Sequence, residues 1–149
     1  MPTLTQLCCR VTLVALLQSL RNLEEARVTW PSLEEQVLWA AKEPILDRRW
    51  GFIDGKNYPA QSPSDPLMQN AMYNGWLYCV FLTGVLCFGV DGCVVWGKHN
   101  FVGSWSDGEM SRELQDQLRR DDNNAPNHGL LSDTAFPVAD GHLGRIMTP

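Results

Sequence analysis

The chain has 149 residues, of which 44% are hydrophobic and 19% are charged, and its net charge is −5. This length suits one domain with a hydrophobic core, is too short for two ordinary domains, and the composition excludes a disordered chain. The negative charge, with no basic run, argues against a protein that holds DNA by its own bulk electrostatics, because neutralising phosphates requires clustered Lys and Arg.

Five cysteines are present, and none of them forms a Cys-x-x-Cys pair. An odd number of cysteines without metal-ligand spacing argues against a disulfide framework or a zinc site. A reducing compartment is the simplest interpretation.

Two helices are expected near the N-terminus. Apolar residues at helical spacing predict an amphipathic helix over residues 4–23. A second helix begins after Ser32, which is the predicted N-cap with Glu35 as its capping-box partner, and it ends before Pro44. Its expected buried face consists of Leu33, Val37, Leu38 and Ala41.

Three strands are expected in the middle of the chain. Residues 51–54 form the first, and the proline-containing stretch 57–70 is expected to be an irregular loop. The apolar run 77–88 predicts a central strand covered on both faces. It is too short and too soon interrupted by Asp91 to span a membrane, and a turn at Asp91-Gly92 returns the chain into a strand over residues 93–96.

The clearest expected helix covers residues 106–120, with Ser106 and Glu109 as a second capping box and Met110, Leu114 and Leu118 on one face. Residues 129–132 then form a short strand. The tryptophans are expected to serve mostly as core anchors; one of them could instead stack on a flipped base, but no local signal marks which. They are Trp30, Trp39, Trp50, Trp76, Trp96 and Trp105.

Three aspartates stand out by their surroundings. Asp54 lies in GFIDGK at residues 51–56, Asp107 ends GSWSD at residues 103–107, and Asp133 lies in LLSDTAFP at residues 130–137. Asp54 and Asp133 each follow a short apolar run that predicts a buried strand, so that the sheet holds the carboxylate while it faces outward. Carboxylates that converge on Mg²⁺ or Mn²⁺ are the usual apparatus for cutting or joining phosphodiesters.

Each aspartate also has a simpler interpretation. Asp54 precedes Gly55, and Asp-Gly is common in turns. Asp133 could merely begin a loop. Asp107 falls in the first turn of a predicted helix, where the helix dipole favours any acid.

The order and spacing of these motifs resemble those of DDE superfamily endonucleases derived from Harbinger-type (PIF/IS5-like) transposases, over residues 28–149. In that family an Asp-Gly strand end, a Pro-Gly-Ser-x-His-Asp motif and a Gly-Asp-Ser-(Gly/Ala)-(Tyr/Phe)-Pro motif follow one another. This sequence departs from the pattern in having Val102 in place of proline and Ser106 in place of histidine.

The resemblance implies an α/β domain with a ribonuclease H-like mixed sheet and flanking helices, in which the first strand neighbours the strand after the first helix. It implies a DNA endonuclease with Asp54 and Asp133 as catalytic residues, and with Asp54, Asp107 and Asp133 as ligands of a divalent metal, Mg²⁺ or Mn²⁺. Family members are typically nuclear, with a cytoplasmic location as the alternative here. They often rely on a separate Myb-like protein to bind DNA.

The family also has a catalytic glutamate on a later helix, a few dozen residues beyond the last aspartate, and the sequence given ends at Pro149. We therefore expect an N-terminal helical segment over residues 1–45 and a C-terminally incomplete nuclease domain over residues 46–149. The competing functions are an inactive transposase remnant that serves in protein interaction, and an unrelated α/β binding domain whose Asp-Gly turns mimic the motifs.

Overall fold

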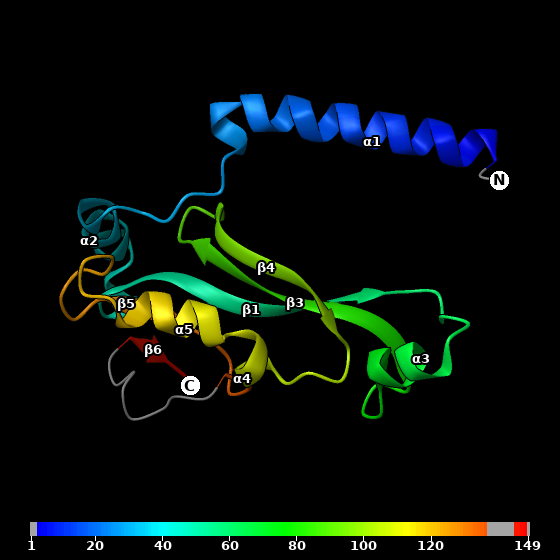
Figure 1. Cartoon of the computed structure of the whole chain (residues 1–149). Helices are drawn as coiled ribbons and strands as arrows, with labels where there is room; N and C mark the ends of the chain where they lie inside the picture. Colours follow the sequence, from blue (N-terminus) through cyan, green and yellow to red (C-terminus); the bar gives the residue numbers. More distant parts are fainter. Residues whose placement is uncertain (1–2, 137–144, 149) are drawn as a thin grey trace.

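A computed structural model describes residues 3–136 and 145–148. Figure 1 shows a twisted sheet with helices packed beside it and the first helix standing apart from it. The helices are α1 (Leu4–Asn22), α2 (Leu33–Lys42), α3 (Pro66–Met72), α4 (Asp107–Met110) and α5 (Arg112–Arg119), with short 3₁₀ turns η1 (Glu24–Ala26) and η2 (Pro44–Leu46). The strands are β1 (Arg49–Pro59), β2 (Tyr73–Asn74), β3 (Cys79–Gly89), β4 (Val94–Val102), β5 (Gly129–Leu131) and β6 (Ile146–Met147).

The described strands form one mixed sheet of six strands in the order β2-β3-β1-β5-β6, with β4 on β3. β3 pairs antiparallel with both β1 and β4, which confirms that the apolar run is a central strand. β1 pairs parallel with β5, as the resemblance implies for the first strand and the strand after the helix. With helices packed beside the sheet, this mixed α/β architecture is consistent with a ribonuclease H-like fold.

The core lies between one face of the sheet and the helices α4 and α5. Met110, Leu114 and Leu118 are buried, as their helical spacing predicts, and they cluster with Ile53 and Val85 of the sheet. The expected continuous helix is interrupted at Ser111, which is fully buried and ends α4 before α5 begins. On β3, Phe81, Thr83, Val85 and Cys87 are buried whereas the residues between them are mostly half-buried, so the two faces are not equally covered.

The expected loop over residues 57–70 is partly wrong. β1 continues to Pro59, because its register with β3 runs from Gly51↔Gly89 to Pro59↔Phe81. Asp65 then caps α3 by accepting hydrogen bonds from the Leu67 and Met68 amides, with Pro66 at the first helical position. Proline is well tolerated there, so the feature taken as a loop signal is in fact a helix start.

The buried face of α2 also differs from the expected one. The predicted capping box is confirmed: Ser32 and Glu35 exchange hydrogen bonds between side chain and backbone. However, the helix buries Gln36 and Ala40, while Leu38 is 64% exposed, and Leu33 and Val37 are exposed as well. The prediction of this face from apolar residues was wrong because one of the buried positions is held by Gln36, a polar residue with hydrogen-bond partners.

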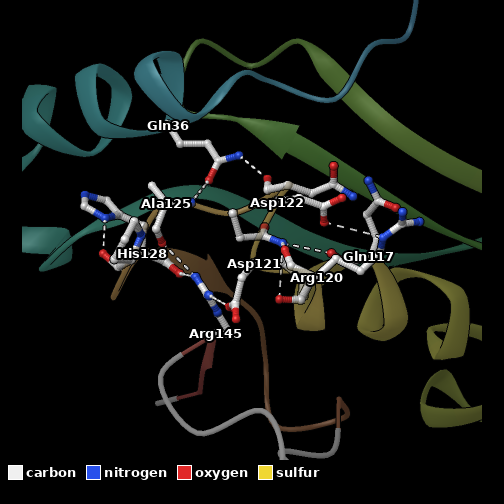
Figure 2. Close-up of polar contacts among 12 residues, drawn as sticks. Gln36, Gln117, Arg120, Asp121, Asp122, Ala125, His128 and Arg145 are labelled. Atoms are coloured by element: carbon white, nitrogen blue, oxygen red, sulfur yellow. Dashed lines mark hydrogen bonds and ion pairs between the residues drawn. The ribbon is translucent and has the colours of Figure 1, made fainter.

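Gln36 connects α2 to the loop that leads into β5 (Figure 2). Its amide nitrogen donates to the carbonyls of Pro31 (3.0 Å) and Asn123 (2.7 Å), and its amide oxygen accepts from the Ala125 backbone amide at 2.9 Å. On the other side of the loop, Arg145 donates to the Ala125 carbonyl at 2.7 Å. The loop that delivers β5 and Asp133 is therefore held from two sides.

α1 contributes nothing to this core. The helix is predicted correctly, but none of its residues is buried. Its N-terminus is capped by Thr3 with Gln6 as the capping-box partner. Within residues 3–136 and 145–148, no helix combines the length and the apolar character needed to cross a bilayer. The proposed division at residue 45 stays a prediction, although α2 packs on β1.

Candidate active site

Asp54 and Asp133 lie at corresponding points of two adjacent parallel strands. The last pair of the β1–β5 ladder is Phe52 with Leu131. Asp54 comes two residues after Phe52, and Asp133 comes two residues after Leu131. Asp54 is still within β1, whereas Asp133 comes after the end of β5. Both side chains are exposed, so the sheet presents two carboxylates at the same level of its parallel half.

Asp107 reaches this region from the helix side. Ser106 caps α4, since its hydroxyl accepts from the Glu109 amide and the Glu109 carboxylate accepts from the Ser106 amide. The cap is therefore Ser106, and the Asp107 carboxylate remains available for another role. A Cβ atom built on Gly55 would lie 3.0 Å from Asp107 Oδ1, so Asp107 packs against the bare backbone of β1 one residue after Asp54.

The three carboxylates interact electrostatically. Burial raises the pKa of the half-buried Asp107 carboxyl, and the negative charges of Asp133 and Asp54 raise this pKa further. Two like charges near a third disfavour its ionised form. A cation at this position would relieve the repulsion, so the chemistry and charge of the donor set fit a hard divalent ion, which prefers carboxylate oxygens.

The side chains nevertheless do not converge on one point. Side chains alternate across a strand, so Asp54 leaves the sheet on the face opposite to Ile53 and Gly55, while Asp107 approaches from the Gly55 face. Asp133 Oδ1 accepts a hydrogen bond from the Ala135 amide at 3.1 Å, which is the geometry of a turn. Among the described residues, no group of three or more Asp, Glu, His or Cys side chains is arranged to hold a metal ion.

Two features escaped prediction from the sequence. The first is Gly55, which serves as the contact surface for Asp107 rather than as half of a turn. The second is a cavity of about 350 Å³ beside Asp107, bordered by Trp76 and Trp105. Trp50 is a core anchor as expected, with Trp30 packed edge-on against it at 5.1 Å, but Trp76 is 88% exposed and Trp105 is 46% exposed. The last residue of the third motif, Pro137, lies outside the described residues.

The mixed α/β sheet carries acids at corresponding positions of two adjacent parallel strands. Residues 53–149 match the DDE superfamily endonuclease family, which is about two-thirds of the chain. The chain belongs to this family, and it is thus a nuclease domain of transposase origin. No curated protein and no solved structure matches the chain.

Proposed function

We propose that this protein is a divalent-metal-dependent endonuclease that acts on DNA phosphodiesters, with a Harbinger-type transposase as its ancestor. The observation that carries the proposal is the placement of Asp54 and Asp133 at equivalent points of two adjacent parallel strands, with Asp107 against the same stretch of β1, within a chain of the DDE superfamily endonuclease family. A carboxyl group whose pKa is raised by burial and by nearby acids, as that of Asp107 is, is typical of functional sites.

In this proposal the side chains of Asp54, Asp107 and Asp133 would turn toward a common Mg²⁺ or Mn²⁺ ion and hold it, and Asp54 and Asp133 would be the catalytic residues. When bound, such an ion would act as a Lewis acid on the phosphate and would lower the pKa of a bound water or hydroxyl. β1 fixes the backbone of Asp54 through its ladders with β3 and β5. Ser106 fixes the start of α4, and Gly55 leaves space for the Asp107 carboxylate.

Charge pairing explains why a separate DNA-binding protein belongs to the proposal. Lys98 pairs with Glu113, Arg119 with Asp116, and Arg145 with Asp121. These pairs reduce the positive field that the chain can offer to phosphates. We therefore include a Myb-like partner that delivers the domain to DNA, and a nuclear location, as parts of the proposal.

The test is titration of the purified chain with Mn²⁺ by calorimetry, beside plasmid nicking in Mg²⁺ or Mn²⁺. Asp54→Asn and Asp133→Asn should each weaken Mn²⁺ binding by about 10- to 100-fold, and Glu25→Gln, an exposed acid near α1, should leave it unchanged. Equal Mn²⁺ affinity in all four proteins would refute the metal site. Metal binding without nicking would favour an inactive domain that serves in interaction.

A further inference from the structure

The cavity beside Asp107 lies between two segments that are distant in sequence. One is the turn after β2, which carries Trp76 and Leu77, and the other is the loop from β4 to α4, which carries Trp105. Phe81 of β3 and Asn57 of β1 also line it. Its volume of about 350 Å³ is at the lower end of the range for small-molecule sites.

Hydrogen bonds hold both walls of the cavity in place. Asn74 donates from its amide nitrogen to the Gly103 carbonyl at 2.9 Å, which ties the β2 turn to the loop before α4. The amide oxygen of Asn74 accepts from the backbone amides of Trp76 and Leu77, each at 3.0 Å. One face of Trp105 stacks on Phe101, with ring centroids 5.1 Å apart and an interplanar angle of 28°. The backbone of both walls and the ring of Trp105 are thus held in place.

Polar groups are available inside this aromatic frame. The Thr83 hydroxyl donates to Asn57 Oδ1 at 2.9 Å and thereby orients the amide of Asn57. Within the part of the chain that the structure describes, the amide nitrogen of Asn57 has no hydrogen-bond partner. It can donate to a ligand acceptor, and Asp107 supplies an acceptor on the cavity's border with the acidic site.

We propose that this cavity is a nucleobase site, which takes one unpaired base of a DNA strand whose phosphate lies beside Asp107. The inference rests on the proposed function, because the shared Asp107 places the base next to the phosphate at the metal. A base offers a neutral aromatic face together with hydrogen-bonding edges, which matches exposed Trp76 and the amide of Asn57. A negatively charged chain gains more from stacking than from contacts to the backbone phosphates, since stacking needs no positive charge.

Fluorescence anisotropy can test this with the full chain and two labelled duplexes, one with a single bulged thymidine and one with an abasic residue at the same position. Ca²⁺ serves as the ion, because it prefers the same oxygen ligands. The bulged thymidine should bind roughly 5- to 100-fold more tightly than the abasic duplex. Trp76→Ala should abolish this preference and Trp76→Phe should keep most of it. Ile45→Ala, which removes an apolar side chain that is 89% exposed outside the cavity, should keep all of it.

Equal affinity of the parent for both duplexes, no binding of either one, or an undiminished preference in Trp76→Ala would overturn the nucleobase site. Sedimentation that shows self-association lost in Trp76→Ala, without a base preference, would assign the turn to contact with a second copy and overturn it too. Ca²⁺-dependent DNA binding without a base preference would leave the proposed function standing. A base preference that is indifferent to Ca²⁺ and to Asp133→Asn would instead support the cavity and count against the metal site.

Discussion

Asp54 and Asp133 occupy equivalent positions on neighbouring parallel strands, each two residues beyond the Phe52↔Leu131 pair that closes the β1–β5 ladder. Adjacent strands lie roughly 4.8 Å apart in a sheet, so this register brings the backbones of the two acids close together. The sheet thus sets the backbone positions of these two acids, whereas Asp107 approaches them from α4. A substitution of Asp107 can therefore remove the electrostatic repulsion at the site without altering the strands of the sheet.

Asp107→Asn should stabilise the metal-free protein by about 0.5–2 kcal/mol in the free energy of unfolding. Burial and the charges of Asp133 and Asp54 raise the pKa of Asp107, so its ionised form costs stability in the fold. Because the pKa of Asp107 is higher in the folded than in the unfolded state, the cost is absent below the ordinary aspartate pKa. It grows as the pH rises toward the raised pKa of the folded state and is fully present above it. Denaturant titrations should show that Asp107→Asn is more stable than the parent at neutral pH but not at acidic pH.

Mn²⁺ should stabilise the parent protein more than Asp107→Asn. The ion compensates the repulsion among the carboxylates in the parent, whereas the variant offers it one ligand fewer. The Tm increase on adding Mn²⁺ should thus be larger in the parent than in Asp107→Asn. A variant with no gain in metal-free stability would show that Asp107 is not under repulsion.

Gly55→Ala should weaken Mn²⁺ binding by about 10-fold or more while the fold is retained. The new Cβ would lie 3.0 Å from Asp107 Oδ1, so the carboxylate has to move away from β1. Gly75→Ala is the matched control, because a Cβ there meets nothing within 4 Å. Calorimetric titration of both variants checks this, and similar affinities in the two would mean that Asp107 does not bind the ion.

Much of the fold could be predicted from local patterns. The apolar run of β3, the Asp91-Gly92 turn and the apolar stripe of α5 each have strong periodic or turn signals, and the structure confirms them. The missed start of α3 is local, since Asp65 caps it with Pro66 at the first helical position, whereas two other failures depend on partners distant in sequence. β1 extends to Pro59 because β3 pairs with it, and Gln36 is buried because the loop at residues 123–125 offers it backbone partners.

For the candidate site, the sequence allowed prediction of which residues belong to it but not of their arrangement in space. Motif order singles out Asp54, Asp107 and Asp133, but nothing in the sequence gives the position of Asp107 against Gly55 or the exposure of Trp76. Both depend on the way in which the β2 turn and the α4 loop meet through Asn74. The catalytic and metal-binding roles of the aspartates stay predictions.

Gln36→Leu should lower the free energy of unfolding by about 1–3 kcal/mol. The side chain is fully buried, and its loss leaves the Ala125 amide and the Asn123 carbonyl without this partner. Gln36→Glu should also destabilise, since a carboxylate cannot donate to the two carbonyls. Glu34→Leu, an exposed change on the same helix, should have little effect in the same urea titration. An unchanged free energy of unfolding in Gln36→Leu would mean that α2 does not hold the loop that leads into β5.

Ser106→Ala and Ser32→Ala remove equivalent capping boxes but should have different consequences for metal binding. Each loses a side-chain acceptor for an N-terminal amide, so each should cost about 1 kcal/mol of stability. Only Ser106 precedes Asp107, and α4 is a single turn of four residues that has little else to fix its start.

Ser106→Ala should therefore also weaken Mn²⁺ binding, by about 10-fold, whereas Ser32→Ala should leave the affinity unchanged. Paired calorimetric and urea titrations on the two variants separate the effects. If both variants lose stability equally and neither loses affinity for Mn²⁺, the start of α4 does not position a metal ligand, and Asp107 acts only through its charge.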